Sequence, residues 1–172
     1  MNNNKLENNW YVFYCKSRAE KKAYDELVKQ EFNVYLPLVQ TERIWSDRIK
    51  KVQLPMFSGY IFVKCNKFAV SKVLQLSQIV APVKTGAEYS KARERDIELL
   101  RIVEQHGLYY SSETSGVKKG DKVEIVAGPL KGYNGYCIEE SGQRLVVIAI
   151  EGVNQDLKIK ISKGAARKIK ES

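Results

Sequence analysis

A short apolar segment near the start of the chain decides the fold: residues 10–16 read WYVFYCK. Its β-branched and aromatic residues are typical of a β-strand. Ser17 follows at once and Glu20 stands three residues later, which is the spacing of a capping box at the start of a helix. We therefore expect a strand over residues 10–15 that leads directly into a helix.

The expected helix carries one apolar stripe. Ala23, Tyr24, Leu27 and Val28 recur at intervals of three and four residues, and the charged residues around them turn outward: Lys21, Lys22, Asp25 and Lys29. This periodicity predicts one helix face that is buried and one that faces water.

Further strands and helices are expected up to His106. Strand-like runs are separated by turn signals at Ser46-Asp47 and Pro55. Gly107 can supply the left-handed residue that ends the last helix, in which Ile97, Leu99, Leu100 and Val103 are the expected buried positions. In chain order, we expect strands over 34–39, 43–54 and 57–64, a helix over 67–76, a strand over 79–84 and a helix that opens at Ser90.

Beyond this point the chain changes character. The stretch 109–116 loses apolar periodicity and is typical of a linker. After it come short strand-like runs at 122–126, 136–138, 145–150 and 157–161, with glycines between them and no convincing helix. Closely spaced strands with glycine turns favour a small barrel.

Together these patterns predict an α+β chain of two domains. Residues 1–107 are expected to form an antiparallel sheet with packed helices. Residues 108–117 are expected to be a linker, and residues 118–172 a small β-barrel.

Composition narrows the function. The net charge of +9 and the isoelectric point near 9.4 favour a polyanionic partner. Three widely spaced cysteines and a single histidine, His106, give no metal-ligand spacing, and no glycine-rich phosphate loop or paired nucleophile is visible. No apolar run approaches the roughly 20 residues that span a bilayer. We expect a cytoplasmic monomer that is not an enzyme and has no cofactor, no metal and no membrane partner.

Three motifs resemble one known family. Residues 10–16 with the Ser17 and Glu20 helix start resemble the opening of a NusG N-terminal (NGN) domain, and residues 55–63, PMFSGYIFV, resemble its central strand. Residues 120–135, GDKVEIVAGPLKGYNG, resemble a KOW motif, which implies that the small barrel is SH3-like. The order and extent of these motifs make the chain similar to NusG family transcription factors, and residues 14–16 are similar to RfaH and to the UpxY antiterminators.

The resemblance implies a transcription elongation and antitermination factor that binds RNA polymerase and suppresses pausing and termination. Within the family it implies a specialised, operon-specific paralogue. Two alternatives stay open: a housekeeping NusG, and a ribosome-associated KOW protein that binds RNA.

The resemblance also implies that the NGN domain docks onto the clamp helices of RNA polymerase. Tyr14, Phe57, Tyr60 and Phe62 match the aromatic positions of that contact. Tyr60 and Phe62 are two apart, so on a strand they share a face. The alternative for each ring is a place in the core.

Two basic patches are candidates for nucleic acid, either the non-template DNA strand or nascent RNA. Cations neutralise phosphates, and an exposed indole can stack on an unpaired base. The resemblance to RfaH implies that Lys16 contacts the non-template strand. The alternative for both patches is a charged surface that faces only water. The first patch is Lys16, Arg18 and Lys21, and the second is Arg43, Trp45, Arg48 and Lys50.

The sequence also departs from the family pattern. Ser58 replaces a proline, and residues 71–73 stand where RfaH carries His-Thr-Thr for a second polymerase contact. In the KOW half, Leu130, Tyr133 and Ile150 are the candidates to bind the termination factor Rho or a small-subunit ribosomal protein.

Overall fold

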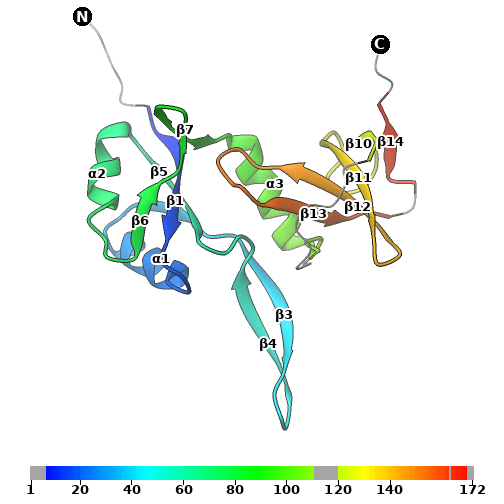
Figure 1. Ribbon diagram of the computed structural model, residues 1–172, viewed down its shortest axis with the longest axis horizontal. Helices are drawn as coiled ribbons and strands as arrows, with labels where there is room; N and C mark the ends of the chain where they lie inside the picture. The colour runs from blue at the N-terminus through cyan, green and yellow to red at the C-terminus, as the bar shows by residue number, and fades with distance from the viewer. Residues whose placement is uncertain (1–6, 111–119, 163, 170–172) are drawn as a thin grey trace, which may run out of the picture. The chain divides into compact units, whose positions relative to one another are not determined.

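The chain folds into two compact units. A computed structural model describes residues 7–110, 120–162 and 164–169 (Figure 1). One unit comprises Met1–Ile97 with Glu151–Val153, and the other comprises Glu98–Ile150 with Asn154–Ser172. Residues 111–117 of the expected linker lie outside the described residues, and the expected domain limits stay a prediction.

The first unit is built on an antiparallel sheet. Its strand order is β2-β5-β1-β6, and β9 also pairs with β1. The register places Tyr14 opposite Tyr60 and Val12 opposite Phe62. The strands are β1 (Asn9–Cys15), β2 (Asn33–Tyr35), β5 (Tyr60–Cys65), β6 (Ile79–Pro82) and β9 (Lys91–Ala92).

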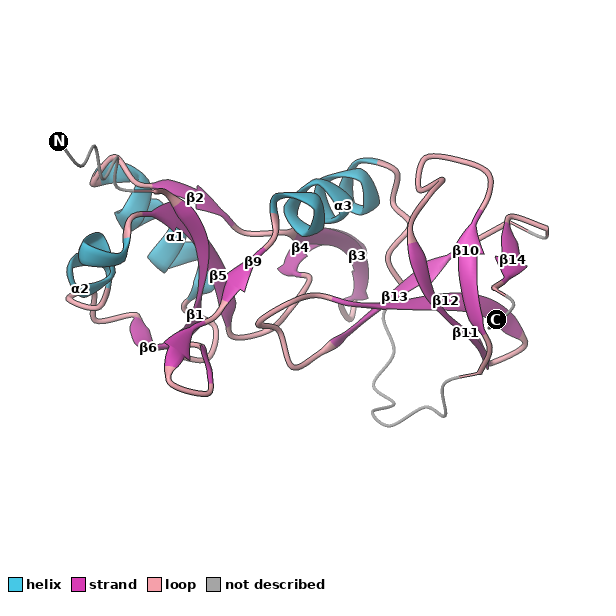
Figure 2. Cartoon of the chain, turned by 90° about the horizontal axis from the view of Figure 1, so that it is seen from above, coloured by secondary structure: helices cyan, strands magenta, loops and turns pink. Residues whose placement is uncertain are grey.

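Two α-helices pack on one face of this sheet. The side chains of Tyr11, Phe13, Ile61 and Val63 form a buried cluster with residues of α1 (Glu20–Lys29) and α2 (Val70–Val73). Figure 2 shows both helices on the same side of β1 and β5. The helix expected over 67–76 is shorter, because Lys67–Ala69 form a 3₁₀ turn that Asn66 caps. This sheet with packed helices confirms the expected class of the first domain.

The start of α1 differs from the expectation. No side chain caps the helix, and its N-cap residue is Ala19, so the expected capping box is wrong. The Glu20 carboxylate instead accepts a hydrogen bond from the Gly59 backbone N–H at 2.7 Å. The apolar stripe is narrower than expected: Ala23 and Leu27 are buried, whereas Tyr24 and Val28 are exposed.

A two-stranded ribbon, which we call the arm, leaves the first sheet. It consists of β3 (Leu38–Ile44) and β4 (Ile49–Pro55), which pair only with each other. Figure 1 shows it extending away from β1 and β5. The strand expected over 34–39 is split, because Pro37 between β2 and β3 lacks the N–H that a continuous ladder needs.

The segment before the last helix also differs. Residues expected to open a helix at Ser90 form β9, and α3 (Glu94–Gln105) begins four residues later. A small hairpin of β7 (Lys84–Thr85) and β8 (Glu88–Tyr89) precedes them. Gly107 has φ +60°, so its predicted left-handed conformation is confirmed.

The second unit contains a five-stranded antiparallel sheet in the order β13-β12-β11-β10-β14. This confirms an all-antiparallel C-terminal half and an α+β chain. Residues 108–110, expected in the linker, lie beside β13, where the Tyr110 N–H donates to the Lys158 carbonyl at 2.9 Å. The strands are β10 (Lys122–Ile125), β11 (Asn134–Glu140), β12 (Gln143–Ala149), β13 (Asp156–Lys160) and β14 (Ala166–Lys168).

None of the helices in the described ranges is long and apolar enough to cross a membrane.

Candidate functional site

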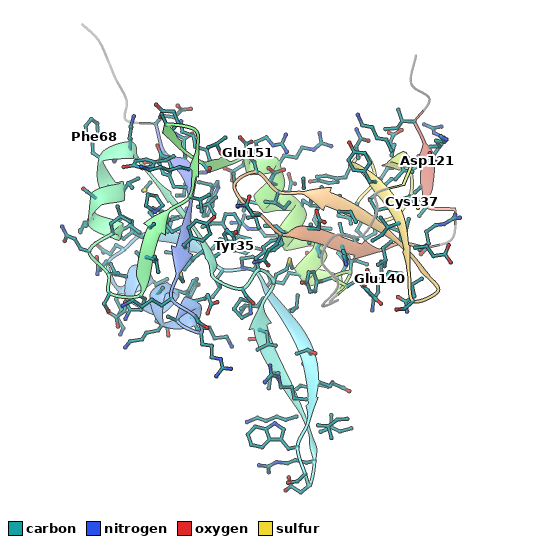
Figure 3. All side chains as sticks on the ribbon, viewed as in Figure 1. Tyr35, Phe68, Asp121, Cys137, Glu140 and Glu151 are labelled. Atoms are coloured by element: carbon teal, nitrogen blue, oxygen red, sulfur yellow. The ribbon has the colours of Figure 1, made fainter. Side chains whose placement is uncertain are left out.

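The sheet face that lies opposite the helices carries a row of rings, which we call the aromatic face. Its members come from β1, β2 and β5, because alternate residues of paired strands share a side. Neighbouring ring centroids lie 5.0 to 6.5 Å apart, within the range of favourable aromatic contacts. The aromatic face consists of Trp10, Tyr14, Tyr35, Tyr60 and Phe62; Figure 3 labels Tyr35.

Most of the aromatic positions chosen from the sequence are buried. Phe57 is 1% exposed and Phe62 is 0% exposed, and Tyr60 is also buried. Tyr14 is half-buried, and its ring contacts that of Tyr60. The structure therefore brings Tyr14, Tyr60 and Phe62 together, while Phe57 lies in the preceding turn. Their contact with a polymerase stays a prediction.

The turn before Tyr60 is held by a residue that the sequence reading missed. Gly59 has φ +82°, a conformation that favours glycine, and its N–H is bound by the buried Glu20 carboxylate. The Gly59 carbonyl accepts a hydrogen bond from the Cys15 N–H at 2.9 Å. One signal was available, because Glu20 shares the buried side of α1 with Ala23 and Leu27 at spacings of three and seven.

The arm gathers the second basic patch on one side. Arg43 pairs with Lys50, and two backbone hydrogen bonds join Trp45 and Arg48 across the turn. Since side chains two apart on a strand share a face, these four residues lie on the same side, which we call the basic face of the arm. All four are exposed, and Trp45 exposes 56% of its surface.

The other side of the arm tip is apolar. Ile44 and Ile49 are cross-strand partners, and both are exposed. The next pair down the same side is Glu42 with Lys51, whose charges cancel. Figure 3 shows side chains standing out on both sides of the ribbon. The tip therefore combines cations, one indole and two aliphatic side chains in water.

The first basic patch adjoins the base of the arm. Lys16, Arg18 and Lys21 are exposed, and the Lys21 ammonium donates to the Gln53 carbonyl of β4 at 2.7 Å. Arg18 has φ +59° in the turn that joins β1 to α1. The two patches, separate in sequence, are thus linked through Lys21.

The candidates in the second unit are mostly enclosed. Leu130 and Ile150 are buried, and Tyr133 is half-buried. The Ile125 N–H donates to the Tyr133 carbonyl at 2.8 Å, which fixes the turn before β11. Among these three candidates, Tyr133 is the one with surface available to a partner, and partner binding by any of them stays a prediction.

The cysteines of the first unit, Cys15 and Cys65, are buried in its core. Burial raises the pKa of the Cys15 thiol to about 12, with a contribution from the nearby Glu20 charge, and burial raises the pKa of Cys65 to about 11. Such thiols stay protonated and unreactive near neutral pH. Within the described ranges, no group of three or more His, Cys, Asp or Glu side chains could hold a metal ion.

Known proteins match this architecture. The family model described as "Transcription termination factor nusG" matches residues 8–101. NusG of Thermotoga maritima, from a structure of its domain interaction, is 19% identical, with 96% of this chain and 99% of that chain covered and a TM-score of 0.59. A chain of the MjSpt4:Spt5 complex is 17% identical over 94% of this chain and 97% of that chain, with a TM-score of 0.31. The Thermotoga likeness supports a shared fold.

Proposed function

Because the chain belongs to the NusG family, whose model matches residues 8–101, we propose that it is an operon-specific antitermination factor. The chain is a transcription elongation factor of this family and not an enzyme. In this role the protein suppresses pausing and termination on a restricted set of operons. It rests on the likeness of residues 14–16 to the corresponding triplet of RfaH.

The aromatic face is the proposed contact with RNA polymerase, a partner that NusG family members bind. Large, stiff rings lose little side-chain entropy on binding, and such residues dominate many interfaces. The observation that carries this proposal is the row of ring contacts from Tyr14 to Tyr60 and from Tyr35 to Phe62. The proposed occupant is the clamp-helix coiled coil of the polymerase.

Exposure ranks the rings within this contact. Tyr14 and Tyr35 keep accessible surface, so they can touch a partner without a rearrangement. Phe57 and Phe62 are buried, so they would reach the polymerase only after a change that exposes them. The proposal therefore gives the first contact to Tyr14 and Tyr35, while the buried Tyr60 ring packs against Tyr14.

A pull-down of RNA polymerase tests the contact. Tyr14→Ala should weaken retention by roughly 30-fold, since loss of a central aromatic anchor costs about 2 kcal/mol. Tyr24→Ala is the matched control, because Tyr24 is an exposed tyrosine on α1. Equal retention of both variants would contradict the assignment.

The arm is the proposed contact with the non-template DNA strand. Its basic face offers Arg43, Arg48 and Lys50 to phosphates and Trp45 to an unpaired base. Lys16, Arg18 and Lys21 extend this surface through the Lys21 hydrogen bond to β4. A nascent RNA strand offers the same chemistry and is the competing ligand.

The proposed mechanism is a shift of the polymerase between two states. A factor that binds the closed clamp more tightly than the open clamp raises the population of the closed, unpaused state. Addition of saturating protein to polymerase halted at a strong pause should shorten the pause lifetime. An unchanged lifetime would contradict this mechanism.

The restriction to particular operons is tested on several templates. A specialised factor increases read-through behind some leader sequences and leaves others unchanged, whereas a housekeeping factor acts on all of them alike. The family match covers most of the N-terminal unit and therefore argues against the alternative of a ribosome-associated KOW protein.

The second unit is proposed to recruit a further partner, either Rho or a small-subunit ribosomal protein. A tethered partner acts at raised effective concentration, so a weak contact is sufficient. Tyr133, which is half-buried, is the proposed contact residue, because Leu130 and Ile150 are buried. Tyr133→Ala should reduce capture of that partner without reducing capture of RNA polymerase.

A further inference from the structure

Residues 108–110 add a short extra strand to the sheet of the second unit, and we call this segment the strap. The Lys160 N–H donates to the Leu108 carbonyl at 2.8 Å, and the Tyr110 N–H donates to the Lys158 carbonyl at 2.9 Å. An isolated antiparallel bridge lies between these two bonds. The strap therefore covers the edge of β13 that does not pair with β12.

The strap also covers an apolar surface of the sheet. The Tyr110 ring packs against a buried cluster of Ile138, Leu145 and Val147 from β11 and β12. The Lys160 ammonium lies 5.6 Å from the centre of the same ring, a distance at which a cation is attracted to an aromatic face. The β13 edge, the apolar cluster and Lys160 together form what we call the strap site. It is suited to an extended polypeptide that carries an aromatic side chain.

The strap is a short segment that is held lightly. Two backbone hydrogen bonds join it to β13, and each such bond adds only a small net stability. All three residues of the strap are half-buried, so water reaches each of them. Local opening of a short edge segment costs less free energy than unfolding of the sheet. The strap site can therefore open while the five strands stay paired.

An open strap site would present a strand edge without the usual protection. Unpaired N–H and C=O groups on an edge are a template for another extended chain, and exposed lysines often prevent such pairing. Lys158 stands on this edge, but its side chain is only 7% exposed and its ammonium binds the Glu140 carboxylate at 2.8 Å. Its charge is therefore neutralised and does not repel an incoming chain.

We propose that the strap site binds an extended segment of a partner protein with an aromatic residue at the Tyr110 position, and that the strap occupies this site in the free chain. Main-chain hydrogen bonds to β13 supply affinity, and the ring beside Lys160 supplies selectivity. The inference goes beyond the proposed function, because it requires neither RNA polymerase nor nucleic acid. The strap site is also separate from Tyr133, which lies in the turn before β11.

An NMR titration of the full chain tests the proposal, with a synthetic peptide of residues 107–112, GLYYSS, as the probe. In Tyr110→Ala the strap competes less. The peptide should therefore shift the Lys160 amide signal at about tenfold lower concentration than in the unaltered chain, the effect of one aromatic contact. Tyr24→Ala, at an exposed tyrosine of α1, is the matched control and should behave like the unaltered chain.

Two results of this titration would overturn the proposal. One is an unshifted Lys160 signal in Tyr110→Ala at millimolar peptide. The other is an equal shift with a control peptide that has alanine in place of its second tyrosine, because the ring would then contribute nothing to recognition.

Hydrogen exchange in the unaltered chain checks the release of the strap without any substitution. The Lys160 N–H bonds to the strap, whereas Ile159 pairs with Val146, so its N–H faces β12. The Lys160 N–H should exchange at least about tenfold faster than the Ile159 N–H, because the strap opens locally. Equal protection of the two amides would show that the strap opens only with the whole sheet, and would overturn the proposal.

Light scattering separates a partner protein from a second copy of this chain. The unaltered chain should be a monomer at the concentration of the titration. A dimer that Tyr110→Ala disrupts would assign the strap site to a second copy and would overturn the assignment to a partner protein.

Discussion

The arm and the aromatic face are both made of antiparallel strand pairs from the first unit, yet they present their side chains differently. The arm has only two strands, and the side chains at its tip are exposed on both sides. The aromatic face belongs to a larger sheet, and Phe62, at its centre, is fully buried. The arm can bind without rearrangement, whereas the aromatic face offers mainly Tyr14 and Tyr35.

Strand periodicity determines which residues share a side of a sheet, but it does not determine what covers that side. The period of two correctly placed Tyr60 and Phe62 opposite Ile61 and Val63. It carries no information on burial, which depends on residues distant in sequence. Substitutions in the aromatic face should therefore mainly reduce stability, whereas substitutions in the arm should mainly reduce binding.

The aromatic face and the arm should differ most in how much a substitution lowers the free energy of unfolding. Phe62→Ala should lower the free energy of unfolding by about 3–5 kcal/mol, because it removes a fully buried ring and leaves a cavity. Trp45→Ala on the arm should change it by less than about 0.5 kcal/mol, since the indole is largely in water. Urea unfolding of the two variants measures both values. Similar losses in the two variants would show that the arm and the aromatic face contribute equally to stability.

Binding of single-stranded DNA should depend on the arm. Trp45→Ala should weaken binding of single-stranded DNA by about 1–3 kcal/mol, the range for a stacked base. Substitution of Arg43, Arg48 or Lys50 by alanine should make DNA affinity less dependent on salt. The slope of log affinity against log salt concentration should fall in magnitude by about 0.7 for each cation removed. Anisotropy titrations over a series of salt concentrations measure both effects. Glu42→Ala is the control from the opposite side of the arm, and a weaker complex with this variant would contradict the assignment to the basic face.

A smaller effect is expected at the turn that positions Tyr60. Glu20→Ala removes the acceptor of the Gly59 N–H and should cost about 1 kcal/mol or somewhat more, since that N–H is left unsatisfied in a partly buried site. Glu20→Gln keeps an acceptor oxygen and should lose less. Thermal unfolding measures the difference, and retention on RNA polymerase reports whether the turn also supports the aromatic face. Equal stability of the Glu20→Ala and Glu20→Gln variants would show that the hydrogen bond to Gly59 does not stabilise the fold.

Local patterns were sufficient for most of the fold. The strand over residues 10–15, the helix after it and the antiparallel second unit followed from apolar spacing and glycine turns. The capping box failed because Glu20 is recruited by Gly59, a residue 39 positions away. The helix expected from Ser90 failed because Lys91 and Ala92 pair with β1. Both failures are cases in which a distant partner outweighs local preference.

The candidate sites divide in the same way. The basic face of the arm could be predicted, because Arg43, Trp45, Arg48 and Lys50 lie within one hairpin and its turn fixes their side. The link between the two basic patches could not, because Lys21 and Gln53 are 32 positions apart and no local motif marks their contact. Sequence alone shows which short segments carry suitable chemistry, and only the tertiary structure shows which of these segments meet.

A pH dependence is expected on the helix side of the sheet, where Cys15 follows Tyr14 on β1. Burial, with a contribution from the Glu20 charge, raises the pKa of the folded Cys15 from 9.0 to about 12. Between these values the unfolded chain releases the thiol proton and the folded chain keeps it, so the free energy of unfolding falls as pH rises through this window and is unaffected below it. Cys15→Ala should flatten that fall in urea unfolding compared at about pH 8 and about pH 10.5. Cys137→Ala, at a half-buried thiol in the other unit, is the control. The exposed arm has no buried titratable group, so arm variants should leave the slope unchanged, and a slope that Cys15→Ala does not alter would show that this thiol is not held in its protonated form by the fold.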